Sequence, residues 1–264
     1  MAEYNPHARD ELLLVLQKRP RLERADTILG VDLSNAPLSG LEVGLARLLG
    51  TNLIQANLDR SRWEGATLDG VKLRKASLRG ATFDRAELDV PDGTPSTEAA
   101  PGPGPGCRVR RTDLNEADLS EAQLAGVTFE GCHLMNARFE RATLSDVTFR
   151  ASDLFRADLR GARLMHCRFD AARAPVSMRR ARLCGAVLID CRFMEVDLSE
   201  ADLTGALLVS CDLRGVNAPQ AVFAGATLVG CNAEGINLDQ AQLGRLAHAG
   251  TRFFHATSRG ARWE

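Results

Sequence analysis

Residues 112–170 repeat one five-residue pattern: TDLNE, ADLSE, AQLAG, VTFEG, CHLMN, ARFER, ATLSD, VTFRA, SDLFR, ADLRG, ARLMH and CRFD. The third place of every five is Leu or Phe, from Leu114 to Phe169, and a small residue stands two places earlier. The remaining places are mostly polar. A repeat of fixed length has to be recognised first, because it decides the architecture of the whole chain.

A period of five fits neither of the common secondary structures, since a helical face recurs about every 3.6 residues and a strand face every 2. It fits a chain that turns a corner every five residues, with the Leu or Phe and the small residue pointing inward. Four such sides close a coil of about twenty residues, and coils stack at about 4.8 Å as a solenoid. Amphipathic helices with accidental Leu spacing are the alternative, which twelve consecutive matches in two columns disfavour.

These residues closely resemble the pentapeptide-repeat family, whose motif is A(D/N)LXX. The match is nearly literal at Ala117-Asp118-Leu119, Ala157-Asp158-Leu159 and Ala201-Asp202-Leu203. The resemblance covers most of the chain and implies an all-β fold, a right-handed quadrilateral β-helix; a family of this kind specifies fold strongly and function weakly. The inward core ladder is expected to include Leu119, Phe129, Phe139, Phe149, Leu159, Phe169, Phe193 and Leu203.

The repeat divides the chain into four segments. Residues 1–27 lack it and predict a short amphipathic helix over Arg9–Lys18, which either caps the open end of the solenoid or binds a partner. Residues 28–89 and 108–264 are expected to form one continuous solenoid. Residues 90–107 are expected to form an inserted loop.

Three places disturb the pattern inside the solenoid. In the run from Leu53 to Leu88, Trp63 is the one bulky exception in the inward column, so we expect an irregular side there. Near Pro175 the inward positions are expected to step by four residues to Met178 instead of five. Trp263 returns to the pattern after His248 breaks it, and is the candidate for closing the C-terminal end.

The insert reads VPDGTPSTEAAPGPGPG over Val90–Gly106. Pro and Gly at this density cannot form the paired backbone of a coil, so the sequence predicts an excursion, mobile or partly polyproline-like. It is either a passive loop or a contact arm. In the quinolone-resistance branch of the resembled family, projecting loops engage DNA gyrase, and this loop resembles those in kind and not in sequence. The candidate contact residues are Val90, Pro91, Asp92, Gly93, Glu98, Pro101, Pro103 and Pro105.

The sequence holds no arrangement typical of an enzyme or a cofactor site. Phosphate-binding, dinucleotide-binding, nucleophile-elbow, zinc-protease and CxxC motifs are all absent. His133 falls in an outward column between Asp113 and Asp153, and a solvated ladder is a better interpretation than a general base. We therefore expect no enzyme activity, no metal and no cofactor.

The cysteines fall mainly in the small inward column, where they are expected to act as buried hydrophobic residues and not as metal ligands. The five in that column are Cys132, Cys167, Cys191, Cys211 and Cys231. Cys184 should face outward and is the candidate reactive thiol.

The composition is that of a foldable chain without strong charge. The 264 residues carry a formal net charge of −1, with 45% hydrophobic and 25% charged residues. Neither a long apolar span nor a signal peptide is present, so we expect a cytoplasmic protein with no membrane span. The ten Arg and five acidic residues of 131–180 spread over several sides, so direct nucleic-acid binding is not expected.

These observations predict a non-enzymatic protein that offers a rigid surface to another protein, with no small-molecule substrate. The family resemblance names a type II topoisomerase, DNA gyrase or topoisomerase IV, as the most specific partner, which the protein would protect from inhibitors. The near-neutral charge favours the alternative, a scaffold or adaptor in a larger bacterial assembly. The sequence does not predict the oligomeric state.

Overall fold

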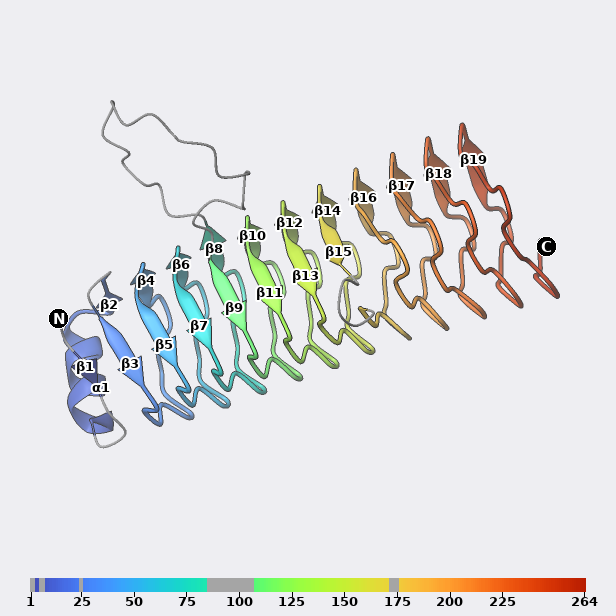
Figure 1. The fold of residues 1–264 in the computed structure, drawn as a ribbon. Coiled ribbons are helices and arrows are strands. Elements are labelled where there is room, and N and C mark those ends of the chain that lie inside the picture. The colour runs from blue at the N-terminus through green and yellow to red at the C-terminus, as the bar shows by residue number, and fades with distance from the viewer. Residues whose placement is uncertain (1–2, 5–7, 24–25, 85–106, 171–175) are drawn as a thin grey trace, which may run out of the picture.

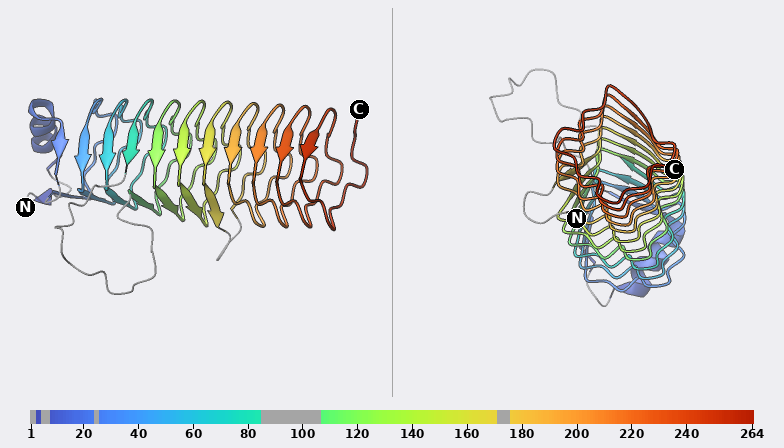
Figure 2. Two further views of the ribbon diagram at one scale, coloured as in Figure 1. Left: turned by 90° about the horizontal axis from the view of Figure 1, so that it is seen from above. Right: turned by 90° about the vertical axis from the view of Figure 1, so that its right-hand side faces the viewer.

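The computed structural model describes residues 3–4, 8–23, 26–84, 107–170 and 176–264. Within these residues one helix, α1 (Arg9–Lys18), stands at the N-terminal end of a rod of stacked coils (Figure 1). Seen along the rod, the coils superpose as a closed outline with distinct sides (Figure 2). This confirms the predicted right-handed quadrilateral β-helix.

Two sides of the rod are formed by parallel sheets. In the described residues, sheet A has eight strands: β1 (Glu3–Tyr4), β3 (Thr27–Leu29), β5 (Arg47–Leu49), β7 (Thr67–Asp69), β9 (Arg108–Arg110), β11 (Thr128–Glu130), β13 (Thr148–Arg150) and β15 (Arg168–Asp170). Sheet B has eleven: β2 (Arg21–Leu22), β4 (Glu42–Gly44), β6 (Arg62–Glu64), β8 (Thr82–Asp84), β10 (Gln123–Ala125), β12 (Thr143–Ser145), β14 (Arg163–Met165), β16 (Val187–Ile189), β17 (Leu207–Val209), β18 (Thr227–Val229) and β19 (Ala247–Ala249). Single parallel bridges, such as Asp113↔His133, link the coils on the other two sides.

The regular step from one coil to the next is twenty residues, as in the pairing of Phe129 with Phe149. The coil that joins β2 to β4 has 21 residues, since Leu22 pairs with Val43, and two coils within the repeat are longer still. Leu68 pairs with Val109, so the first long coil contains 21 extra residues. Leu164 pairs with Leu188, so the second contains four extra residues. The shortened step predicted near Pro175 is therefore wrong: the interruption is an enlargement, and residues 171–175 lie outside the described residues.

The corners explain the composition of the motif. The residue before each inward Leu is often Asp or Asn, and its side chain accepts a hydrogen bond from the backbone N–H two residues later, at 2.9 Å from Phe155 N to Asp153 Oδ1. Such Asx turns are the local structure that Asp favours. The corner residue after the turn has a left-handed backbone, with φ of 63° at Gly161 and 56° at Arg156.

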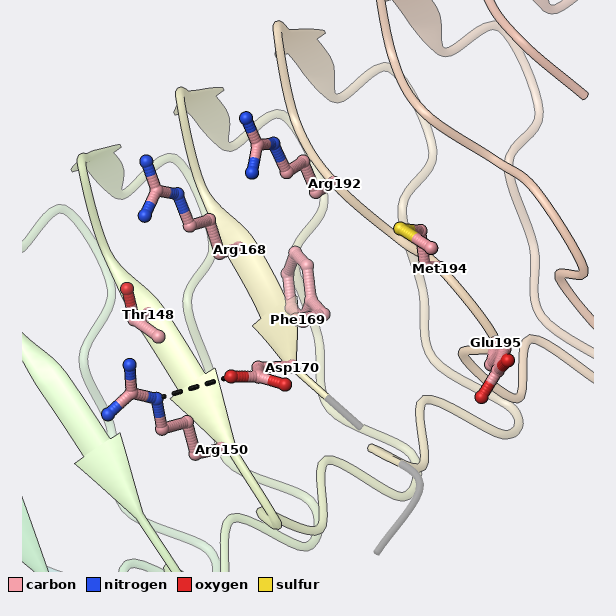
Figure 3. A pocket seen from close by; sticks show the side chains of 8 residues that line it. All are labelled: Thr148, Arg150, Arg168, Phe169, Asp170, Arg192, Met194 and Glu195. Atoms are coloured by element: carbon pink, nitrogen blue, oxygen red, sulfur yellow. Dashed lines mark ion pairs between the residues drawn. The ribbon is translucent and has the colours of Figure 1, made fainter. Parts of the chain in front are cut away.

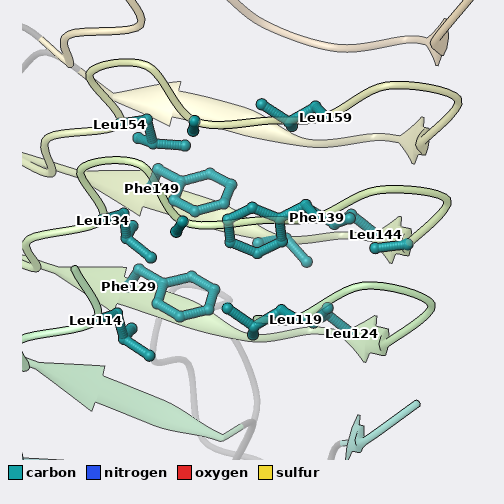
Figure 4. Close-up of a cluster of buried hydrophobic side chains, with 14 of the residues drawn as sticks. Leu114, Leu119, Leu124, Phe129, Leu134, Phe139, Leu144, Phe149, Leu154 and Leu159 are labelled. Atoms are coloured by element: carbon teal, nitrogen blue, oxygen red, sulfur yellow. The ribbon is translucent and has the colours of Figure 1, made fainter. Parts of the chain in front are cut away.

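The core is a continuous column of the inward side chains (Figure 4). Phe129, Phe149, Phe169 and Phe193 stack along sheet A and its extension, with ring centroids 5.0, 5.1 and 4.4 Å apart. All eight residues of the expected core ladder are buried. At roughly 1.5–3 kcal/mol for each fully buried large side chain, this column supplies a sizeable core without a cofactor.

Trp63 does not make its side irregular, contrary to the expectation. It lies in β6, pairs with Val43 and Phe83, and is 1% exposed. Its ring stacks on Phe83 at 5.6 Å, and its Nε1 donates to Ser61 Oγ at 2.7 Å. The interior of the coil therefore accommodates the indole ring of Trp63, because Ser61, the small inward residue two places earlier, accepts the hydrogen bond from its N–H.

The two ends of the rod differ. Leu12 and Leu16 of α1 are buried against the first coil. Strands β1 and β2, within residues 1–27, already pair with β3 and β4, whereas the boundaries predicted for the four segments stay predictions. The expected closure by Trp263 is wrong, since its side chain is 61% exposed in a coil that packs on one neighbour only.

Candidate interaction surfaces

The histidine and carboxylate ladder has the predicted geometry and forms no cluster. Asp113, His133 and Asp153 occupy successive coils through parallel backbone bridges. Across the described part of the chain, no group of three or more His, Cys, Asp or Glu side chains could hold a metal ion. Asp113 and Asp153 each accept a hydrogen bond from a backbone N–H two residues later, at 3.0 Å from Asn115 and 2.9 Å from Phe155.

Buried thiols form a ladder inside the rod. Cys167, Cys191, Cys211 and Cys231 are at most 1% exposed and occupy successive coils. Each thiol lies near a carbonyl oxygen of the preceding coil, for example 3.4 Å from Cys191 Sγ to Leu164 O. The neighbouring Cys167 thiol and burial raise the pKa of Cys191 to about 12. The Cys191 thiol is therefore protonated near neutral pH, and all four buried side chains pack as hydrophobic groups.

Cys107 belongs to the inward column, and the sequence interpretation missed it. It is fully buried, which raises the pKa of its thiol to about 12. The signal that could have revealed it is its position two residues before the inward Val109.

Cys184 is half-buried and does not have the environment of a reactive thiol. Burial raises its pKa to about 11, so little thiolate is present near neutral pH. The expected reactivity at this position is therefore corrected.

The predicted contact arm, with its candidate residues Val90–Pro105, lies outside the described residues. The structure describes its anchors, Asp84 at the end of β8 and Cys107 before β9. These anchors belong to the corner between sheet B and sheet A.

A groove opens on the side of sheet A and its extension (Figure 3). Its volume is about 530 Å³, and its lining comprises Thr148, Arg150, Arg168, Phe169, Asp170, Arg192, Met194 and Glu195. Arg150 Nε lies 3.4 Å from Asp170 Oδ2. Arg168 and Arg192 are exposed, adjacent across the coils, and form no side-chain ion pair within the described residues. The groove therefore offers two available guanidinium groups beside the exposed Met194.

Opposite charges alternate along another outward column, which contains Asp118, Arg138, Asp158 and Arg182. Arg138 lies 3.5 Å from Asp118, and Arg182 lies 3.8 Å from Asp158. Asp158 is only 7% exposed. Burial raises its pKa, but the hydrogen bonds and charge of Arg160 outweigh that effect and hold the pKa below the usual value. The arginines of this column therefore offset the charges of its aspartates, and the column presents no acidic stripe.

The comparisons with known families agree with the coil geometry. The family model described as "Pentapeptide repeat region" matches residues 106–174, and "Pentapeptide repeats (8 copies)" matches residues 46–85, 177–215 and 206–245. Together the matches cover more than half of the chain. The chain belongs to the pentapeptide-repeat family. The search of curated proteins gives no match.

Several solved structures are similar to this pentapeptide-repeat protein. HetL, described as involved in heterocyst differentiation regulation in the cyanobacterium Nostoc sp. strain PCC 7120, is 21% identical over 97% of this chain and 95% of its own, with a TM-score of 0.33. QnrB1, a plasmid-mediated fluoroquinolone resistance protein, is 18% identical over 77% and 90%, with a TM-score of 0.34. Rfr23 from the cyanobacterium Cyanothece 51142 is 18% identical over 77% and 91%, with a TM-score of 0.24. These values carry no argument about function.

Proposed function

We propose that this pentapeptide-repeat protein is a non-enzymatic interaction protein, and that it acts in the cytoplasm on a type II topoisomerase such as DNA gyrase. An interaction role is supported by the way each coil uses its residues. Two of every five side chains fill the interior, and the other three remain for the outer surface. In the described residues, the α1 helix is too short to span a membrane and no other helix occurs. Support for the topoisomerase comes from the family resemblance of the repeat.

The groove with Arg168 and Arg192 is the surface we assign to the partner. Two arginines one coil apart can bind carboxylates on a facing protein segment, each through paired N–H donors. Met194, which is 40% exposed, adds an apolar contact beside them. Aromatic residues, Met and Arg are the residue types enriched at protein interfaces.

A supercoiling assay with DNA gyrase and a fluoroquinolone tests the proposal. We expect the protein to preserve supercoiling at drug concentrations that stop gyrase alone. The variant R168E/R192E should lose at least about tenfold in potency, because charge reversal at an interface costs more than about 1.4 kcal/mol. R252E is the matched control, an exposed arginine in the same column at the end of the rod.

The absence of protection and of gyrase binding over a wide protein range would contradict the topoisomerase role. The second candidate, a scaffold or adaptor, is favoured by the near-neutral charge of −1 and the self-neutralising column of Asp118 and Arg138. For a scaffold, affinity capture from the host lysate should return one stable partner that is not a topoisomerase, and its binding should be lost in the same R168E/R192E variant.

A further inference from the structure

The groove on the side of sheet A contains two arginines to which the described part of the chain supplies no counter-charge. Arg168 and Arg192 pair through a parallel bridge on adjacent coils, and both side chains are exposed. Figure 3 shows them leaving the two coils on the same side of the groove. Because parallel coils stack at about 4.8 Å, the two positive charges are held close together. Like charges at this separation repel each other, and an anion bound between them would offset that repulsion.

The arginine pair is isolated along its outward column. In the successive coils, Thr148 precedes the pair and Asp212 follows it. Asp212 is already bound by Arg214, whose Nε and Nη2 lie 2.8 and 2.7 Å from its two carboxylate oxygens. A nucleic-acid backbone carries one charge at every nucleotide and would need a longer run of cations. The column therefore favours one compact anion over an extended polyanion.

The spacing of the pair favours an anion that carries two charges on one group. Side chains on the same face of an extended strand are about 6.8 Å apart, so two carboxylates of a partner strand are spaced more widely than the two coils. A phosphorylated side chain carries about −1.5 to −2 charge near neutral pH and three acceptor oxygens. Both guanidinium groups can donate to these oxygens, whereas a single carboxylate brings one negative charge to two cations.

The rest of the lining also disfavours a partner segment with several acidic residues. Glu195 lines the groove at a place away from Arg168 (Figure 3), and it would repel a further carboxylate there. Asp170 lies 3.4 Å from Arg150, so this third arginine is already paired. Met194 is 40% exposed and offers an apolar contact to an uncharged neighbour of the bound group.

We propose that the groove accepts the phosphorylated side chain of a partner protein, so that the partner binds after phosphorylation. This inference rests on the interaction role proposed above and names the chemistry that the groove accepts. Clusters of arginine are the usual means by which proteins recognise phosphorylated segments. The volume of about 530 Å³ far exceeds that of a phosphate ion, so the groove also has room for the residues beside the phosphorylated one.

Fluorescence anisotropy with the full-length protein tests the proposal. The probes are fluorescein-labelled peptide mixtures, randomised around one fixed phosphoserine, phosphothreonine or phosphotyrosine, and matched mixtures with serine, glutamate or two aspartates at that place. At least one phosphorylated mixture should bind at least about tenfold more tightly than every unphosphorylated mixture. The proposal is overturned if no phosphorylated mixture exceeds the mixtures with glutamate or two aspartates.

Variants of the two arginines test the site of binding. R168Q/R192Q should weaken binding of the phosphorylated mixture at least about tenfold, because both guanidinium groups are lost. R252Q is the matched control, since Arg252 is an exposed arginine in the same column without an ion pair among the described residues, and it should leave the affinity unchanged. Equal effects of the two variants, or none from R168Q/R192Q, would show that the phosphoryl group binds elsewhere.

Competition identifies the source of the phosphoryl group. Inorganic phosphate should displace the phosphorylated mixture only at concentrations at least about tenfold above the Kd of the peptides, because it lacks the contacts beside the phosphoryl group. A single-stranded DNA oligonucleotide should not displace it. Displacement by phosphate near the peptide Kd would mean a site for free phosphate compounds, and displacement by the oligonucleotide would mean a nucleic-acid site; either result would overturn the proposal.

These measurements contain no topoisomerase, so they separate the inference from the proposed function. A protein that binds phosphorylated peptides through Arg168 and Arg192 but does not protect gyrase would refute the topoisomerase role and support the inference. A protein that protects gyrase but shows no preference for phosphorylated peptides would overturn the inference and leave the topoisomerase role intact.

Discussion

Phe149 shows what one inward residue contributes. Its ring lies between those of Phe129 and Phe169 at 5.0 and 5.1 Å, and its side chain is fully buried. The same column contains Leu213 in the coil after Phe193, so the interior accepts either residue type. What this position requires is therefore a large apolar side chain that fills the interior, and an aromatic ring is not essential.

The first prediction follows from this packing. Phe149→Ala should lower the free energy of unfolding by about 3–5 kcal/mol, because a cavity remains between two rings. Phe149→Leu should cost at most about 1.5 kcal/mol, because it nearly conserves volume and repeats a residue of the column. Chemical denaturation measures both, and equal losses would show that stacking, not volume, stabilises the ladder.

The second prediction concerns acid stability at Asp158. Its folded pKa is held below the ordinary value of 3.8, so its carboxylate stabilises the fold above that pH and the contribution is lost as the pH falls through the folded pKa. Asp158→Asn should therefore be less stable than the wild type at neutral pH, and the difference should shrink in strong acid. Unfolding measured at several pH values tests this, and a constant difference would contradict it.

The residues also show where sequence reasoning stopped. The period of five identified the inward columns, because only two of five side chains can enter the bore. It did not identify Cys107, since the preceding insert isolates this residue from a run of repeats. It misjudged Trp63, because the room beside a large side chain depends on which residues stand next to it in space, here Phe83 and Ser61.

At the scale of elements, the helix α1 covers the first coil. Leu12 is fully buried, whereas Leu14 of the same helix is 54% exposed. The helix therefore contributes one apolar face, as the pattern of residues 9–18 predicts. A solenoid needs such caps because each coil buries its core only against its neighbours.

The third prediction compares two leucines of this helix. Leu12→Ala should cost about 2–5 kcal/mol, because it removes a buried side chain at the end of the core. Leu14→Ala should stay within about 0.5 kcal/mol. Amide hydrogen exchange should show the loss of protection in the coil of β3 and β4 for the first variant only. Equal effects of the two changes would mean that α1 does not seal the core.

The lengths of the two enlarged coils could not be predicted from the five-residue pattern. A step of four and a step of nine leave the same register in a period of five, so the pattern near Pro175 could not distinguish a missing residue from four added ones. The candidate surfaces were equally hidden. The groove is lined by residues on adjacent coils, and which residues are adjacent depends on these lengths.

At the scale of the whole molecule, the coils form one rod with a common bore, and the described surface differs from side to side. One side presents the groove with its two available arginines, and another presents the paired charges of Asp118 and Arg138. The interruptions preserve the bore, because pairing resumes in register after each of them. Function can therefore vary on the surface while the core repeats.

The central claim is that from β3 onward every described coil closes after twenty residues unless an insert is present, and that the first insert adds 21 residues to its coil. Thermal unfolding of two deletion variants tests it directly. Deleting residues 85–105 leaves one glycine for the corner and should keep Tm within about 3 °C of the wild type. Deleting residues 85–106 leaves the coil one residue short and should lower Tm by more than about 5 °C. Equal Tm values for the two variants would contradict the closed twenty-residue coil.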